Sequence, residues 1–137
     1  MRRGHLVPLS NQAIEVLESM KEVSGHGKFV FPSRLSPRGD KHMSTEAMLA
    51  ALRRMDYARE EMTVHGFRGI AATELYESGR WSEGAIERQL AHVEGNSVKA
   101  AYSYAQYLGE RRDMMQWWSD YLDGLRDTVI FERRKCS

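Results

Sequence analysis

Four polar residues between positions 65 and 102 have types that can hold a phosphate group or attack one. His65 and Arg68 lie three positions apart, so a helix would place both side chains on one face. A guanidinium can bind two oxygens of one phosphate, and an imidazole can add a hydrogen bond or move a proton. A second histidine, His92, ends a short helical pattern, and Tyr102 comes ten residues later. A tyrosine can act as a covalent nucleophile where a cationic pocket stabilises the charge that develops on phosphorus.

Taken singly, each of these residues has an ordinary structural explanation. His65 fits a cap at a helix start, Arg68 fits a surface ion pair, and a histidine such as His92 is favoured near a helix C-terminus by the dipole. Tyr102 stands close to other tyrosines, which usually pack against a core. A zinc site would need further ligands, and Cys136 is remote in sequence, so we expect no metal and no cofactor. Only the combination, in this order, favours phosphate chemistry.

The spacing of apolar residues predicts a mainly α-helical fold with a remnant of a small antiparallel sheet near the N-terminus. Helices are expected over residues 11–23, 45–55, 66–77, 83–92, 97–102 and 108–125. Ser10, Ser44 and Ser82 are the expected N-caps. The third helix is predicted to bury Phe67, Ile70, Ala71 and Leu75. The longest helix has a predicted apolar stripe at Leu108, Met115, Trp118, Leu122 and Leu125.

Two further segments have strand character. His5–Leu9 is typical of a short strand, and Pro8 within it indicates a sheet edge or a strand end. Thr128–Phe131 also favours a strand, within a tail (residues 127–137) that could pair with a sheet edge, dock on another molecule or be disordered. Open hydrogen-bonding groups at Leu6–Leu9 predict pairing with a second copy of the chain, or with Val129–Phe131.

Length and composition fit one domain, with 137 residues, 42% hydrophobic and 28% charged. No apolar run approaches the roughly 18 residues of a membrane span, so we expect no membrane partner. The single cysteine, Cys136, cannot form an internal disulfide, which favours a reducing cytoplasm. The net charge is +1, and paired arginines such as 53–54 and 111–112 are typical of solvated helix faces. Charge alone therefore does not indicate nucleic acid.

In their order, these features resemble the tyrosine recombinases, and among them the integrases of phages, prophages and enteric-type genomic islands. The resemblance runs from residue 5 to residue 123, and the ordered set is far more specific than any one motif. The segments that carry it are His5-Leu-Val-Pro-Leu-Ser10, Phe29-Val-Phe-Pro-Ser33, His65-Gly-Phe-Arg68, Ile86-Glu-Arg-Gln-Leu-Ala-His92 and Glu110-Arg-Arg-Asp-Met-Met-Gln-Trp-Trp118.

The resemblance implies site-specific DNA recombination through a 3′-phosphotyrosine. His65, Arg68 and His92 would contact the scissile phosphate, with Arg68 neutralising its developing charge. Tyr102 would attack phosphorus and leave a free 5′-hydroxyl, which later attacks in reverse to join a different strand. The bond energy stays in the covalent link, so the chemistry needs neither ATP nor a metal. The implied partners are double-stranded DNA and other integrase protomers, including a second copy of this chain, in the bacterial cytoplasm at the nucleoid, with no small-molecule substrate.

Two departures from the family pattern affect what this chain is expected to do. The family's site also uses an arginine on an early helix and a lysine in the hairpin before the strand at His5, and neither is matched in these 137 residues. Tyr104 stands near where the family usually has an arginine, which makes it a second, less favoured nucleophile. We therefore expect residues 1–126 to be a truncated integrase catalytic domain that is inactive alone. The alternative is a non-catalytic helical module, left by a truncated prophage gene, that binds DNA or an intact integrase.

Overall fold

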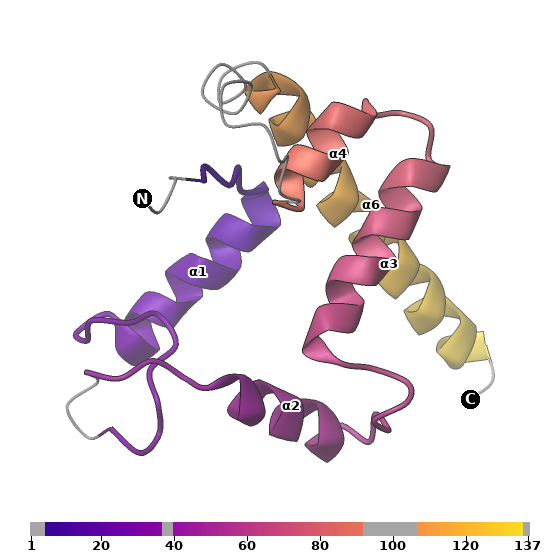
Figure 1. Ribbon diagram of the computed structural model, residues 1–137. Coiled ribbons are helices and arrows are strands. Elements are labelled where there is room, and N and C mark those ends of the chain that lie inside the picture. Colours follow the sequence, from indigo (N-terminus) through magenta and orange to yellow (C-terminus); the bar gives the residue numbers. More distant parts are fainter. Residues whose placement is uncertain (1–4, 37–39, 92–106, 136–137) are drawn as a thin grey trace. The chain divides into compact units, whose positions relative to one another are not determined.

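The computed structural model describes residues 5–36, 40–91 and 107–135, with side chains described as far as residue 128. The helices in these ranges, labelled in Figure 1, are α1 (Asn11–Ser24), α2 (Thr45–Arg54), α3 (Val64–Glu77), α4 (Glu83–Gln89) and α6 (Leu108–Lys135). The predicted mainly α-helical class is confirmed. Contacts between residues divide the chain into two units. Unit 1 consists of residues 1–12 and 72–137, and unit 2 of residues 13–71.

The strand predicted at His5–Leu9 is not formed. The carbonyl of Leu6 instead accepts a hydrogen bond of 2.5 Å from the guanidinium of Arg111 on α6. In the described ranges, sheet-like pairing is confined to one antiparallel bridge between Pro32 and His42. Because Leu6–Leu9 does not form a strand, it does not offer the open strand edge from which pairing with a second copy was predicted.

The strand character of the tail is also overridden. Helix α6 continues to Lys135, so Thr128–Phe131 is helical. β-branched residues favour strands, but adding residues to an existing helix is far easier than starting a new one. Val129–Phe131 is consequently not a strand partner for the N-terminal segment.

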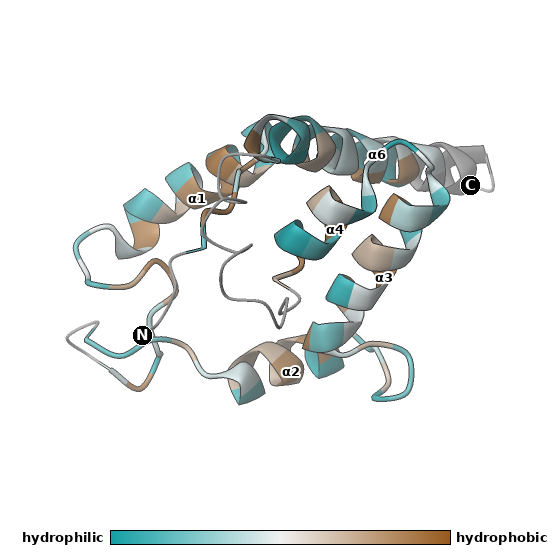
Figure 2. Ribbon diagram, turned by 45° about the horizontal axis from the view of Figure 1, so that its top comes forward, coloured by the Kyte–Doolittle hydropathy of each residue, from teal (hydrophilic) through white to brown (hydrophobic). Residues whose placement is uncertain are grey.

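The core of unit 1 lies where α4 and the end of α3 pack against α6. Figures 1 and 2 both show α4 beside α6. The buried residues of this core are Leu75, Ile86, Leu90 and Met114, with Ala72, Trp81 and Trp117 packed against them. The inward positions predicted for Ile86 and Leu90 are thus confirmed. Ser82 caps α4 as predicted, because its hydroxyl oxygen accepts a hydrogen bond of 3.3 Å from the Ala85 N–H.

Helix α6 turns a different face to this core from the one predicted. Met114 is fully buried, whereas its neighbour Met115 is only half-buried. Leu122 and Leu125 are 44% and 48% exposed, so the C-terminal end of the predicted apolar stripe faces solvent. The buried line instead runs through Arg111 and Met114, three residues apart on one helix face.

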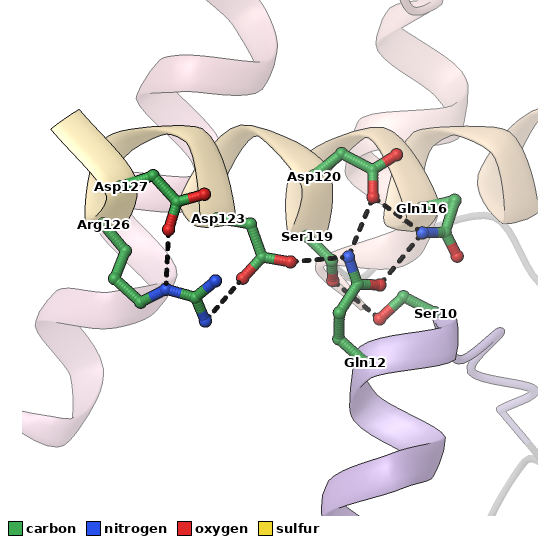
Figure 3. A network of polar contacts seen from close by, with 8 residues as sticks. All are labelled: Ser10, Gln12, Gln116, Ser119, Asp120, Asp123, Arg126 and Asp127. Carbon is green, nitrogen blue, oxygen red and sulfur yellow. Dashed lines mark hydrogen bonds and ion pairs between the residues drawn. The ribbon is translucent and has the colours of Figure 1, made fainter.

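Polar side chains attach the start of α1 to α6, as Figure 3 shows. The amide nitrogen of Gln12 donates hydrogen bonds to the carboxylates of Asp120 (2.8 Å) and Asp123 (2.9 Å). The hydroxyl of Ser119 donates to the buried hydroxyl of Ser10 at 2.6 Å. These bonds hold residues 10–12 on α6, and with them the segment that precedes α1.

Among the residues of unit 2 that the structure describes, few side chains are buried. Ser44 caps α2 as predicted, its hydroxyl oxygen accepting from the Ala47 N–H at 3.3 Å. Leu52 on α2 is the buried hydrophobic residue of this unit within the described ranges. None of the described helices is apolar throughout (Figure 2), and none is long and apolar enough to cross a membrane.

Candidate active site

Helix α3 presents the first pair of predicted site residues. It begins at Val64, earlier than predicted, because Thr63 caps it: the Gly66 N–H donates to the hydroxyl and the carbonyl oxygens of Thr63, both at 3.0 Å. His65 is exposed and Arg68, about one turn later, is half-buried. Both lie near the helix N-terminus, where the dipole and the free backbone N–H groups favour a negative charge. An anion such as a phosphate would therefore be stabilised here.

Arg53, at the end of α2, fixes the chain that leads into α3. Its guanidinium donates to the carbonyl oxygens of Tyr57 (2.6 Å) and Ala58 (2.9 Å). It also donates to the carbonyl oxygen of Met62 at 3.0 Å, two residues before α3 begins. A planar guanidinium has enough donors, in fixed directions, to serve all three acceptors. Arg53 thus sets the entry to the helix that carries His65.

The sequence predicted that Phe67 and Ile70, which lie beside this pair, are buried, and that prediction is wrong. Phe67 is 53% exposed and Ile70 is 46% exposed, whereas Leu75 is 2% exposed, as expected. The inward-facing part of α3 is therefore its C-terminal end, which belongs to unit 1. The start of α3, which carries His65 and Arg68, exposes more of its apolar surface to solvent than the C-terminal end does.

The remaining predicted site residues follow α4. Leu90 ends the helix and is 7% exposed. Ala91 then has a φ of 51°, a left-handed conformation that costs an alanine about 1 kcal/mol and turns the chain sharply. His92, Tyr102 and Tyr104 lie outside the described residues. The structure thus brings together His65 and Arg68, and their roles remain predictions.

A second group of basic residues lies near the end of α4. Arg111 is 1% exposed, and its Nε donates to the side-chain oxygen of Gln89 at 2.9 Å. Its other bond reaches the Leu6 carbonyl at 2.5 Å, so one guanidinium joins the N-terminal segment to the last residue of α4. His5 and Arg88 are the chain neighbours of these two acceptors.

Two of these three basic groups, His5 and Arg111, have a lowered pKa. Partial desolvation, then the charges of Arg111 and Arg88, lower the pKa of His5, and a hydrogen bond with the Gln89 backbone opposes this effect. Burial, followed by the charge of Arg88, lowers the pKa of Arg111. The charges of Arg111 and Arg88 thus disfavour the protonated form of His5, and the charge of Arg88 disfavours that of Arg111.

Arg53 and Arg111 were missed because both belong to arginine pairs that are typical of solvated surfaces. In each pair the first residue is drawn into the fold, while Arg54 and Arg112 are exposed. For Arg111 a signal did exist, since it stands three residues before Met114 and three after Leu108, in line with apolar positions. For Arg53 no comparable signal exists, because its acceptors are backbone carbonyls.

Metal binding has no support in the described ranges. They contain no group of three histidine, cysteine, aspartate or glutamate side chains that could hold a metal ion.

Comparisons with known proteins agree on one family. The model of the phage integrase family matches residues 1–108. The chain is 47% identical over 132 residues to the integrase of Enterobacteria phage P4, which covers 95% of this chain and 30% of that protein. It is 45% identical over 132 residues to the putative protein IntB of Escherichia coli K12, covering 95% of this chain and 33% of that protein. It is also 45% identical over 120 residues to the prophage integrase IntA of the same strain, covering 88% of this chain and 28% of that protein. The chain thus spans about a third of the length of these curated relatives, and no solved structure matches it.

Proposed function

The chain belongs to the phage integrase family, and from that premise we propose that it forms part of an enzyme that cuts and rejoins DNA at specific sites through a 3′-phosphotyrosine. The observation that carries the proposal is the pair His65 and Arg68, about one turn apart at the start of α3, with neither side chain buried. A phosphodiester carries one negative charge, and the transition state of its cleavage concentrates charge on the same oxygens. A guanidinium near a helix N-terminus suits that charge.

Each predicted site residue has a role in this proposal. Arg68 binds two oxygens of the scissile phosphate, and His65 and His92 donate hydrogen bonds to it. Tyr102 supplies the nucleophilic oxygen. Removal of one such charge-stabilising donor typically costs about a hundredfold or more in rate.

The reaction balances without a nucleotide cofactor such as ATP and without a redox partner. The phenolic oxygen of Tyr102 bonds to phosphorus as the bond from phosphorus to the 5′ oxygen breaks. The phenol loses its proton to a base, and the 5′ oxygen gains a proton as it leaves. A 5′-hydroxyl then attacks the phosphotyrosine, which restores a diester and frees the tyrosine. Joining a different strand requires two cut strands at once, so we propose double-stranded DNA and other integrase protomers as partners, in the bacterial cytoplasm at the nucleoid.

We propose further that residues 1–137 alone give no turnover. The family resemblance calls for two more cations on the phosphate, an arginine and a lysine, which these residues do not match. By the same magnitudes, two missing cations lower the rate by about ten-thousandfold or more.

The test is an exchange of segments. This chain replaces the matched third of the phage P4 integrase, and the covalent protein–DNA adduct is measured on a nicked DNA substrate of that integrase. We expect an adduct from the exchanged protein, none after Tyr102→Phe, and an undiminished adduct after Tyr104→Phe, which is the matched control. The 137-residue chain alone should form no adduct.

Other outcomes would change the assignment. An adduct that survives Tyr102→Phe but not Tyr104→Phe would move the nucleophile to Tyr104. DNA binding without any adduct from the exchanged protein would favour the non-catalytic DNA-binding or integrase-interacting module instead.

A further inference from the structure

The chain between α1 and α2 folds back on itself within unit 2. The N–H of Met43 donates to the carbonyl oxygen of Phe31, and the N–H of Ser33 donates to the carbonyl oxygen of Lys41, both at 2.8 Å. These two bonds lie on either side of the antiparallel bridge of this segment. They join the two arms of a basic hairpin, which comprises the described residues 28–36 and 40–43.

The basic hairpin carries positive charge that no acid balances. It has three cationic side chains, Lys28, Arg34 and Lys41, and one carboxylate, that of Asp40. All three cations are exposed, and within the part of the chain that the structure describes none of them forms an ion pair. The carboxylate of Asp40 instead accepts a hydrogen bond from the hydroxyl of Ser36. The positive charge of the hairpin is therefore available to a partner.

Ring contacts place one of these cations on the hairpin. The Nζ of Lys28 lies 5.7 Å from the centroid of the Phe29 ring, a cation–π contact. On the other arm, the ring of His42 packs edge-on against the same Phe29 ring, with 5.8 Å between their centroids. The Nδ1 of His42 is itself 2.9 Å from the carbonyl oxygen of Met43. Lys28 is thus positioned by contacts that involve both arms.

The tip of the hairpin projects from unit 2. The N–H of Ser36 donates to the carbonyl oxygen of Ser33 at 3.0 Å, which closes a tight turn with Arg34 and Leu35 at its centre. Leu35 is 93% exposed, so no described part of the chain packs over the tip. Because Ser33 pairs with Lys41, Arg34 and Lys41 lie at the same end of the hairpin. Cations on a projecting turn can approach a rigid polyanion without a clash from the rest of the unit.

We propose that Lys28, Arg34 and Lys41 bind backbone phosphates of duplex DNA outside the cleavage site, without regard to base sequence. Lysine and arginine neutralise DNA phosphates and release the counterions condensed on them. Cations without an acidic partner suit this role, because binding then breaks no ion pair. None of the three belongs to the pair His65 and Arg68, which is assigned to the scissile phosphate. That the polyanion is duplex DNA rests on the proposed function, and an acidic protein is the competing partner.

The first measurement is the affinity of the 137-residue chain for a short DNA duplex over a range of salt concentrations. We expect Lys28→Gln and Lys41→Gln each to lower the slope of log affinity against log salt by about 0.9, the value of one phosphate contact. The double variant should lower it by about 1.8. Both side chains are exposed, so both variants should fold, which circular dichroism checks. Absence of duplex binding by the unaltered chain, or an unchanged slope in the double variant, would overturn the proposal.

Arg126→Gln is the matched control. It also removes one positive charge from an exposed side chain, but Arg126 pairs with Asp123 at 3.1 Å and with Asp127 at 3.3 Å. Because that charge is already balanced, its removal should change the slope by less than about a third of one contact. Equal losses of slope in Arg126→Gln and Lys28→Gln would mean that net charge alone drives binding, and the proposal would be wrong.

A second measurement separates DNA from an acidic protein. The chain is titrated with a polyglutamate peptide that carries the same number of negative charges as the duplex. We expect the duplex to bind more tightly, because its phosphates are held at a fixed, close spacing along a rigid helix. Tighter binding of the peptide, weakened by Lys28→Gln, would assign the hairpin to an acidic protein and overturn the assignment to DNA.

The exchanged protein, in which this chain replaces the matched third of the phage P4 integrase, separates this proposal from the proposed function. There the adduct reports on cleavage and the salt slope reports on the hairpin. An adduct together with an unchanged slope in the double variant overturns the hairpin surface and keeps the proposed function. A lowered slope in the double variant, with no adduct from the exchanged protein, keeps the surface while the proposed function fails.

Discussion

At the scale of single residues, Arg53 determines how the chain enters α3. We expect Arg53→Lys to lower the free energy of unfolding by about 1–2 kcal/mol, because one ammonium cannot reach three carbonyl oxygens in the directions a guanidinium serves. Arg54→Lys, at the exposed neighbour, should change it by less than about 0.5 kcal/mol. Urea unfolding followed by circular dichroism measures both. Equal effects of the two substitutions would mean that the three bonds contribute nothing to stability.

His5 should make stability depend on pH. Its pKa in the folded chain lies below the ordinary value of 6.5, so the unfolded chain binds the proton more readily. Stability is therefore full above pH 6.5 and falls as the pH drops through 6.5 toward the lower folded-state pKa. Urea unfolding at about pH 7.5 and about pH 5.5 should show a smaller difference for His5→Gln than for the unaltered chain. His26→Gln, outside the basic group at the end of α4, is the comparison, and an identical pH dependence in both variants would refute the prediction.

At the scale of elements, the register of α6 can be tested with two adjacent methionines. Met114→Ala should cost about 2–4 kcal/mol, because a fully buried side chain leaves a cavity among Leu75, Ile86 and Leu90. Met115→Ala should cost less than about 1 kcal/mol, since Met115 is half-buried. Thermal unfolding of both variants decides between this register and the stripe predicted from sequence. A larger loss of stability for Met115→Ala than for Met114→Ala would instead support the apolar stripe predicted from the sequence.

The helices themselves could be predicted from sequence because their signals are local. Ser44 and Ser82 sit before apolar residues at helical spacing, and both act as caps. The strand expected at His5–Leu9 failed because a strand requires a partner, and the partner of this segment is a side chain on α6. The strand character of Thr128–Phe131 is overridden for a related reason, since this segment continues the long helix α6.

In the candidate site, too, local placements could be predicted from sequence and long-range contacts could not. The spacing of His65 and Arg68 was enough to predict that they share a helix face, and α3 confirms that placement. The position of Arg111 in line with Leu108 and Met114 indicates that it faces inward, but its acceptors could not be predicted, because they lie 22 and 105 residues away in sequence. Contacts of that range depend on the tertiary fold, which no local pattern contains.

At the scale of the whole molecule, the two units differ in how much they bury. Leu75, Ile86, Leu90 and Met114 belong to unit 1, whereas Leu52 is the buried hydrophobic residue described in unit 2. Few buried apolar contacts mean a low free energy of local opening. His65 and Arg68 are carried by unit 2, and we therefore predict that the helix start that holds them opens locally at a lower free energy than the core of unit 1.

Hydrogen exchange tests this difference. Amides of α2 should exchange at least about tenfold faster than those of α4 and of α6 around Met114. Leu52→Ala should accelerate exchange in α2 further and leave α6 nearly unchanged. Equal protection in α2 and α6 would contradict the prediction, as would an equal response of both helices to the substitution.

The aromatic packing of unit 1 has an optical consequence. All three tryptophans of the chain, Trp81, Trp117 and Trp118, lie in this unit. The rings of Trp81 and Trp117 are 6.1 Å apart and inclined by 60°, and Trp117 stacks on Tyr121 at 5.4 Å. Indole rings this close and not parallel couple their electronic transitions, which gives a paired band in circular dichroism. Light absorbed by these rings therefore reports on unit 1 alone, without any added label, and changes in unit 2 leave the band unaltered.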